Sequence, residues 1–275
     1  MQTSTNPPTS DPSNLRRRRL AFLKRRRGRA TTMTVVEHLR ELRTRLVISL
    51  AVFLVLSTLA FFFYDPILEL MRRPLCSLPE RLLGPQGCDL IFTRPLGGFM
   101  FRLKVTALVG ISAASPIWLY QLWAFIVPGL SRKERRYGIP FMLSAIVLFG
   151  VGVVLAYLTM PQGIQILVSL AGEGLVPLID AEEYLNFVGL MLLGFGLTFE
   201  LPLIIFFLGL AEVVTVEQLR AQRRGAFVGI VALSAIITPS QDPYTMMALA
   251  LPIYLLYELT ILLLKMVMKR RAAKA

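Results

Sequence analysis

The chain has 275 residues, of which 55% are hydrophobic and 17% are charged, and its formal net charge is +13. A soluble domain of this length is much less apolar, so the composition is that of an integral membrane protein. The positive charge does not indicate nucleic acid binding, because Lys and Arg alternate between successive connecting segments instead of lining one face.

The first 33 residues are strongly basic and carry their charge in two clusters, Arg16–Arg19 and Lys24–Arg29. An organelle transit peptide is also rich in Arg, but it spreads this charge over an amphipathic helix. Clustered charge together with early prolines predicts instead a disordered arm that is attracted to anionic lipid. We therefore expect three parts: a basic cytoplasmic tail (1–33), a membrane domain (34–268) and a second basic tail (269–275).

The segment ahead of the first apolar run has helical periodicity. Leu39 and Leu42 recur on the side opposite Glu41 and Arg43. This pattern predicts an amphipathic helix that leads along the membrane surface into the first span. A plain positively charged anchor is one alternative, and an exposed Glu41–Arg45 ion pair worth about 0–1 kcal/mol is another.

Six apolar segments follow, and they predict an all-α protein with six transmembrane helices. The segments are 46–64, 104–127, 139–159, 184–211, 225–239 and 244–264. Lys and Arg gather in residues 1–45, in the connections after the second and fourth segments, and in the C-terminal tail. The positive-inside rule therefore places both termini in the cytoplasm.

The first outer connection, 65–103, contains five prolines, and we expect it to form a small helical or irregular extracytoplasmic cap. Cys76 and Cys88 both lie in this segment. An oxidising compartment would allow a disulfide between them, and two unpaired thiols are the alternative. Because no histidine accompanies them, we expect their role to be structural.

Glu200 is the only formal charge in the apolar segment 184–211. A carboxylate in the middle of a bilayer costs about 2.5–3.5 kcal/mol even on lenient insertion scales, so it normally faces protein or water. Gly194, Gly196 and Pro202 surround it and predict a tilted or kinked helix. A proton relay, an ion site and a partner contact are all open uses for such a group.

The fifth and sixth spans are predicted to be short. Residues 225–238 would extend over only about 21 Å as a helix, whereas the hydrocarbon core is about 30 Å thick. We expect the membrane to be thinned locally at this hairpin.

The sequence lacks the motifs of nucleotide and metal chemistry. It has neither a phosphate-binding Gly-rich loop with Lys nor a dinucleotide fingerprint, and His38 is its single histidine. We therefore expect no cofactor, no metal site and no enzymatic activity.

Three segments, 38–46, 116–136 and 198–202, together resemble the TatC family, the multi-spanning subunit of twin-arginine protein translocases. The resemblance implies six spans in the bacterial plasma membrane and a place in an oligomeric Tat complex. It also implies recognition of Arg-Arg signal peptides on folded export substrates, and assembly with single-span subunits of the TatA and TatB type. Transport in this family is driven by the proton-motive force.

The resemblance places the carboxylates that recognise the signal peptide at Glu41 and Glu134. The neighbouring family positions are Leu39, Arg43, Phe125 and Leu130. Two Arg side chains call for two acids on one surface, because a guanidinium binds a carboxylate in a planar, charge-assisted pair.

Other family positions fall on Pro74, Tyr157, Glu200 and Asp242. Tyr157 could equally be an ordinary interfacial aromatic residue, and Asp242 could simply stabilise a turn. At the expected partner contact in span six the family often has glutamine, whereas this chain has Met246, and Thr238 supplies a nearby polar group.

A proton-coupled secondary transporter is the alternative function. It would use Glu200 with Glu258 as a relay and the Gly and Pro breaks as a discontinuous-helix site. The sequence shows no internal repeat, and the two carboxylates are expected at different depths.

Overall fold

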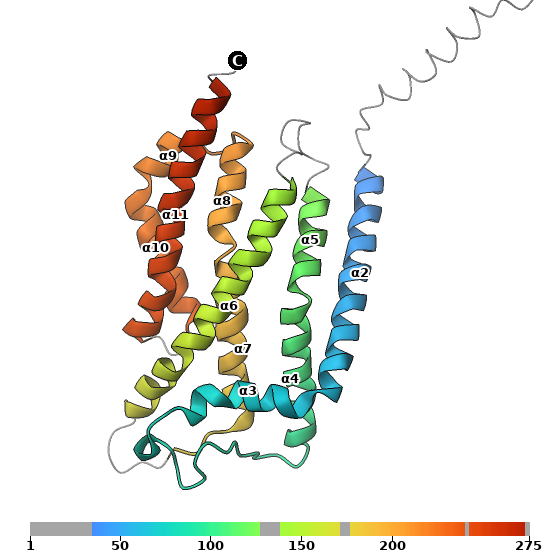
Figure 1. Ribbon diagram of the computed structural model, residues 1–275, viewed down its shortest axis with the longest axis vertical. Helices are drawn as coiled ribbons and strands as arrows, with labels where there is room; N and C mark the ends of the chain where they lie inside the picture. The colour runs from blue at the N-terminus through green and yellow to red at the C-terminus, as the bar shows by residue number, and fades with distance from the viewer. Residues whose placement is uncertain (1–34, 127–137, 171–176, 240–241, 273–275) are drawn as a thin grey trace, which may run out of the picture. The chain divides into compact units, whose positions relative to one another are not determined.

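The computed structural model describes residues 35–126, 138–170, 177–239 and 242–272. The chain divides into two units, Met1–Arg43 and Thr44–Ala275. In the first unit the described residues, 35–43, are helical. The second unit contains all the helix packing considered below, and every regular element among its described residues is a helix (Figure 1).

The first helix, α2, extends over Val35–Phe62 without a break, so the expected leading helix and the first span are one element. Within the second unit, its side chains are mostly exposed. A close contact occurs at Ser57, whose Cα would lie 2.9 Å from a Cβ added to Gly110. Arg102 donates to the Phe61 carbonyl over 3.1 Å, and its guanidinium lies 4.4 Å from the Phe61 ring centroid. These contacts attach the end of α2 to α4.

The cap, which we define as residues 64–96, contains α3 (Tyr64–Cys76) and the short 3₁₀ helix η1 (Glu80–Leu82). Figure 1 shows α3 lying across the end of the helix bundle. A disulfide joins Cys76 to Cys88. The chain then approaches the start of α7, where Ile91 N donates to the Ile179 carbonyl (3.1 Å) and the Ile91 carbonyl accepts from Ala181 N (2.9 Å).

The second apolar segment forms two helices, α4 (Gly97–Ala113) and α5 (Ser115–Ile126), which are bent by 50°. Pro116 explains the bend, because it cannot donate to the Ser112 carbonyl and it disfavours helical geometry at Ser115. The prediction of one continuous helix over 104–127 is therefore wrong, although Pro116 is a residue that commonly bends a helix.

The long helix α6 (Gly138–Ser169) packs against α7 (Ala181–Thr198). α7 is followed after two residues by α8 (Leu201–Leu210), and this break lies where Pro202 and the glycines predicted a kink. α6 and α7 approach closely at Gly152, which has no Cβ. A Cβ added there would lie only 2.7 Å from the Phe195 carbonyl oxygen.

The last part of the chain contains α9 (Val216–Ala221), α10 (Arg223–Ile237) and α11 (Pro243–Ala272). α10 is short, with 15 residues, as predicted. The prediction of a short sixth span is wrong, because α11 has 30 residues. Lys265 carries the first charge after the apolar run, but Lys is a good helix former, so the helix continues beyond it.

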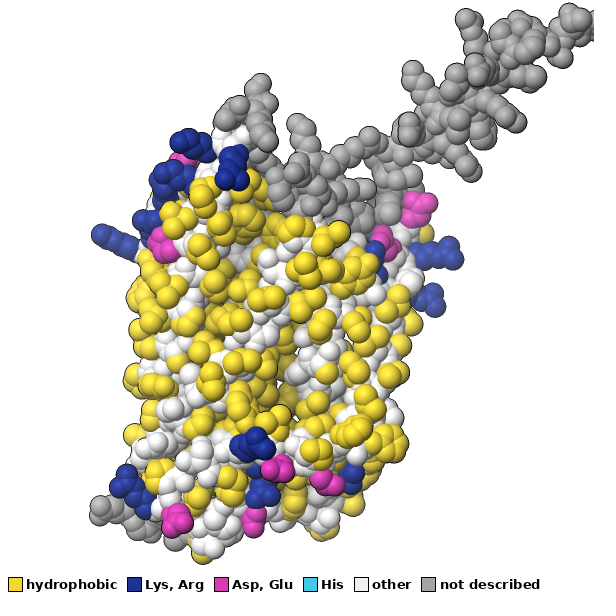
Figure 2. All heavy atoms as spheres, viewed as in Figure 1, with side chains coloured by type: hydrophobic (Ala, Val, Ile, Leu, Met, Phe, Trp, Pro, Cys, Tyr) yellow, Lys and Arg dark blue, Asp and Glu magenta, His cyan; other side chains and the backbone are white. Residues whose placement is uncertain are grey.

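Among the described residues, four helical segments are long and apolar enough to cross a membrane, and the bent pair α4–α5 makes a fifth if it is counted as one span. α10 is shorter than the roughly 20 residues that a span needs, so six spans remain a prediction. Figure 2 shows apolar side chains over the middle of the second unit and charged ones toward its two ends. This distribution fits a bundle whose sides face lipid.

Candidate functional site

Glu200 lies in the break between α7 and α8, with its side chain turned into the protein. The residue is 7% exposed, and its Oε1 atom accepts no hydrogen bond from any described residue. The backbone remains satisfied, since Glu200 N donates to Leu197 O (3.1 Å) and its carbonyl accepts from Ile204 N (3.0 Å). The carboxylate is therefore the unsatisfied group in an otherwise regular turn.

The break is a consequence of the local sequence. Pro202 has no N–H to donate to the Thr198 carbonyl, so the helix cannot continue with an unbroken ladder. Thr198 donates its hydroxyl to the Gly194 carbonyl (2.5 Å), a side-chain bond that often bends helices. Thr260 of α11 donates to the Pro202 carbonyl over 3.2 Å and attaches the start of α8 to the last helix.

Glycines on either side of the break let neighbouring helices approach it. A Cβ on Gly194 would lie 2.4 Å from a methyl of Ile237 in α10, and one on Gly209 would lie 2.3 Å from Leu264 in α11. With Gly152 on α6, these contacts hold the segment around Glu200 on three sides. The Glu200 carboxylate is therefore a polar group held in a fixed position inside an apolar helix bundle, where it can accept a hydrogen bond.

The connection between α10 and α11 contains the residues expected to contact partner helices. Thr238 is fully buried and donates to the Ser234 carbonyl over 2.9 Å. Asp242 is also buried, and it accepts a hydrogen bond from Thr245 N at 2.8 Å and another from the Thr245 hydroxyl. Asp242 therefore stabilises the first turn of α11, and Met246 next to it is half-buried.

Pro74 lies on α3 in the cap, and Tyr157 of α6 bonds to the same helix. Tyr157 of α6 donates its hydroxyl to the Leu70 carbonyl over 2.9 Å. Tyr184 of α7 similarly donates to the Met71 carbonyl over 2.6 Å. Two membrane helices thus hold α3 through successive carbonyl groups, an arrangement that the sequence pattern did not reveal.

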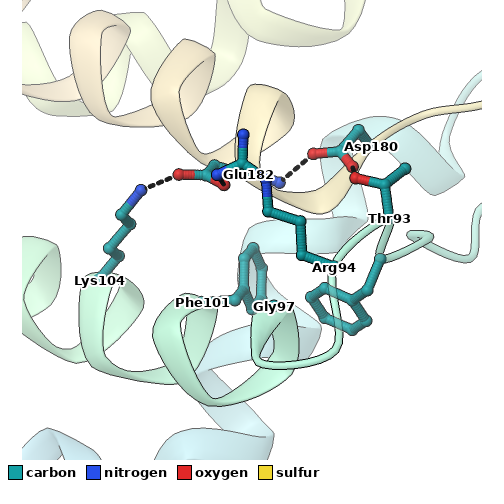
Figure 3. A pocket seen from close by; sticks show the side chains of 8 residues that line it. Thr93, Arg94, Gly97, Phe101, Lys104, Asp180 and Glu182 are labelled. Atoms are coloured by element: carbon teal, nitrogen blue, oxygen red, sulfur yellow. Dashed lines mark hydrogen bonds and ion pairs between the residues drawn. The ribbon is translucent and has the colours of Figure 1, made fainter.

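A small polar pocket lies between the cap and the start of α7 (Figure 3). Glu182 pairs there with Lys104, and Arg94 lies 3.7 Å from the same carboxylate. Asp180 accepts from the backbone N–H groups of residues 182 and 183 and from the Thr93 hydroxyl. Desolvation pushes the pKa of Asp180 upward, but these hydrogen bonds and the charge of Arg94 outweigh it and lower the pKa below its usual value.

The residues expected to recognise a signal peptide are only partly described. In the first unit Leu39 and Arg43 are exposed, and Glu41 is half-buried. In the second unit Phe125 is half-buried near the end of α5. Glu134 and Leu130 lie outside the described residues, so the proposed pairing of two carboxylates rests on the sequence.

Glu258 forms an ion pair that sequence reasoning missed. Its carboxylate lies 2.7 Å from Arg223 and accepts from the Tyr254 hydroxyl at 3.3 Å. Arg223 begins α10, and Glu258 lies on α11, so the antiparallel hairpin brings them together. In the described part of the chain, no group of three or more His, Cys, Asp or Glu side chains could hold a metal ion.

These features define a multi-pass helical membrane protein in which the carboxylate of Glu200 is buried at the break between α7 and α8. The family model described as Sec-independent protein translocase protein (TatC) matches residues 37–252. The chain belongs to this TatC family and is a protein translocase component.

The relatives and solved structures agree with this assignment. TatC of Frankia casuarinae is 42% identical over 256 residues, which cover 90% of this chain and 70% of that protein. TatC of Aquifex aeolicus is 36% identical over 243 residues, which cover 87% and 98%. A crystal structure described as the twin-arginine translocase receptor TatC has a TM-score of 0.69 at 36% identity, covering 82% of this chain and 99% of that one.

Proposed function

We propose that this protein is the receptor and assembly core of a twin-arginine translocation system. It binds Arg-Arg signal peptides of folded proteins at its cytoplasmic face and recruits single-span subunits of the TatA and TatB type. The observation that carries the proposal is the family match over residues 37–252, which includes both expected recognition acids and Glu200.

Recognition depends on Glu41 and Glu134. Each carboxylate accepts a charge-assisted, bidentate pair of hydrogen bonds from one guanidinium of the signal peptide. Leu39, Phe125 and Leu130 supply apolar contacts beside the two Arg residues, and Arg43 adds a polar contact to the peptide backbone. A Lys-Lys peptide binds less well, because an ammonium lacks the planar geometry of a guanidinium.

Partner helices contact the membrane-embedded polar groups. Glu200 offers a carboxylate oxygen without a partner among the described residues, in a break that α6, α10 and α11 surround. Thr238, Asp242 and Met246 form a second contact region at the end of the short helix α10. A single-span subunit that carries a polar residue at the matching depth would satisfy the Glu200 oxygen.

The charge distribution sets the proposed orientation. Both termini face the cytoplasm of a bacterial plasma membrane, and the basic N-terminal arm binds anionic lipid. Export uses the proton-motive force, without a cofactor and without enzymatic activity of this chain. The complete complex contains several copies of the subunits.

The transporter hypothesis needs Glu258 as the second member of a relay with Glu200. The ion pair of Glu258 with Arg223 and its hydrogen bond from Tyr254 weigh against this role. Both contacts hold the Glu258 carboxylate of α11 within the hairpin that it forms with α10.

A binding assay in nanodiscs tests the proposal by comparing Arg-Arg with Lys-Lys signal peptides. Glu41→Ala and Glu134→Ala should each weaken Arg-Arg binding about tenfold or more, since a charge-assisted hydrogen bond contributes about 1.5–3 kcal/mol. Glu217→Ala is the matched control, because Glu217 is an exposed acid on α9. Unchanged Arg-Arg binding in both variants would refute the recognition mechanism.

A further inference from the structure

The two cysteines of the cap have different surroundings. Cys76 is exposed at the end of α3, whereas Cys88 is half-buried and packs against the main hydrophobic core. Arg72 contacts Cys88 directly: its Nη2 atom is 3.1 Å from the Cys88 carbonyl oxygen and 3.9 Å from the Cys88 sulfur. The disulfide therefore joins an exposed cysteine to a half-buried cysteine whose sulfur lies next to a positive charge.

The surface beside Cys76 is hollowed. A depression of about 350 Å³ is lined by Asp65, Leu68, Glu69, Arg72, Arg73 and Cys76. Its open side gives an incoming thiol or disulfide a route to the Cys76 sulfur. Cys88 does not line this depression.

We propose that the Cys76–Cys88 pair is a substrate site for a dithiol–disulfide exchange protein on the outer side of the membrane. Cys76 is the sulfur that exchanges with this carrier, and Cys88 is the resolving and leaving sulfur, stabilised by Arg72. The outer location follows from the proposed topology, whereas the order of the two cysteines follows from the structure alone.

Oxidation of the two thiols takes two successive exchange reactions with the carrier. The Cys76 thiolate attacks the carrier disulfide, which forms a mixed disulfide and releases one carrier thiolate. The Cys88 thiolate, held beside Arg72, then attacks the Cys76 sulfur and releases the second carrier thiolate. Two protein thiols lose two electrons and two protons, and the carrier disulfide becomes a dithiol.

Reduction follows the same path in reverse. A reducing thiolate attacks the exposed Cys76 sulfur, and Cys88 leaves as a thiolate. A nearby guanidinium stabilises a thiolate, and a better leaving group departs faster. Asp89 opposes this effect, because its carboxylate pairs with the same guanidinium, but it is highly exposed and solvated.

The disulfide has a mechanical role in the cap. The segment that it closes carries Leu78, Leu82 and Leu83, which pack into or against the core to which α3, α4, α6, α7 and α11 contribute. Gln86 in the same segment donates to the Pro177 carbonyl over 3.0 Å. The disulfide thus fixes the segment 76–88, which follows α3 and contacts the chain just ahead of α7.

The first test uses the full-length protein in nanodiscs with oxidised glutathione as the probe. The variant Cys88→Ser, which retains Cys76, should form the mixed disulfide about tenfold faster than Cys76→Ser, as measured by intact mass over time. Equal rates, or a faster reaction of the variant that retains Cys88, would overturn the assigned order.

The second test examines Arg72 in the otherwise unchanged chain. Reduction of the disulfide by reduced glutathione should slow about threefold or more in Arg72→Gln, because the Cys88 thiolate is a poorer leaving group. Arg81→Gln is the matched control, since Arg81 is exposed on η1 and does not line the depression beside Cys76. A purely structural role for Arg72 predicts the opposite sign, because loss of its ion pair with Asp89 would loosen the loop and speed reduction.

The third test identifies the exchange protein in cells. Cys88→Ser should accumulate a mixed disulfide with an extracytoplasmic dithiol protein, seen as a band that disappears on reduction, and Cys76→Ser should not. A band in neither variant, together with spontaneous formation of the wild-type disulfide, would exclude a carrier. None of these tests depends on signal-peptide binding, so their failure is separate from failure of the proposed function.

Discussion

Tyr157 donates its hydroxyl hydrogen to the carbonyl group that Pro74 leaves without a helical donor. In a regular helix the N–H of residue 74 would bond the Leu70 carbonyl, but proline has no N–H. The Tyr157 hydroxyl lies 2.9 Å from that oxygen and replaces the missing bond. Pro74 in the cap and Tyr157 in α6 are 83 positions apart in the sequence, and the hydroxyl of one replaces the N–H that the other lacks.

Tyr157→Phe should destabilise the protein by about 1 kcal/mol, because the Leu70 carbonyl loses its hydrogen-bond donor. Such a loss lowers the unfolding temperature of a chain of this size by about 2–4 °C. In a Pro74→Ala background, the new N–H of residue 74 can bond Leu70, so Tyr157→Phe should have a smaller effect. Thermal unfolding in detergent measures both, with Tyr120→Phe as the control, and equal effects in the two backgrounds would contradict the coupling.

Glu200→Gln should retain much of the export activity, whereas Glu200→Leu should lose most of it. Gln keeps the size and hydrogen-bonding capacity of a side chain that has an unsatisfied oxygen in the helix break, and Leu removes both. An export assay with a folded Arg-Arg substrate measures the difference. Complete loss of export in the Gln variant would instead show that the carboxylate must titrate.

Asp180 should make the cap sensitive to acid. Because its folded pKa is lowered, its contribution is present above the unfolded pKa of about 3.9 and is lost as pH falls through the lower folded value. Asp180→Asn preserves a good helix N-cap, so it should remove this pH dependence with little loss of stability at pH 7. Unfolding temperatures between pH 3 and 7 test this, with the exposed Glu183→Gln as control.

The bilayer should be thinner beside α10 than beside α6. A 15-residue helix is about 22 Å long at about 1.5 Å per residue, against a hydrocarbon core of about 30 Å. The buried side chains of Thr238 and Asp242 place polar groups at its end, where an ordinary bilayer would still be apolar. Lipid density around the protein in nanodiscs measures the thickness, and a uniform value around the bundle would exclude local thinning.

Patterns that depend on neighbouring residues could be predicted from the sequence, and contacts between distant residues could not. The helical class, the break near Glu200 and the short α10 follow from apolar runs, glycines and prolines. Proline could also have revealed the bend at Pro116, but an apolar run by itself does not show it. The pairing of Arg223 with Glu258, and of Tyr157 with Leu70, depends on which helices pack together.

Substitution of two glycines on α6 by alanine distinguishes the effect of helix propensity from the effect of packing. Gly152→Ala should destabilise the protein by about 1–3 kcal/mol, because its Cβ would lie 2.7 Å from the Phe195 carbonyl oxygen, a backbone atom that cannot rotate away. Gly150→Ala meets nothing within 4 Å and should be neutral or stabilising by up to about 1 kcal/mol, since Ala favours helix. Thermal unfolding of the two variants in the same detergent compares them directly. Equal effects of the two substitutions would mean that α6 and α7 can separate at Gly152. The inference that this contact helps to fix the segment around Glu200 would then be wrong.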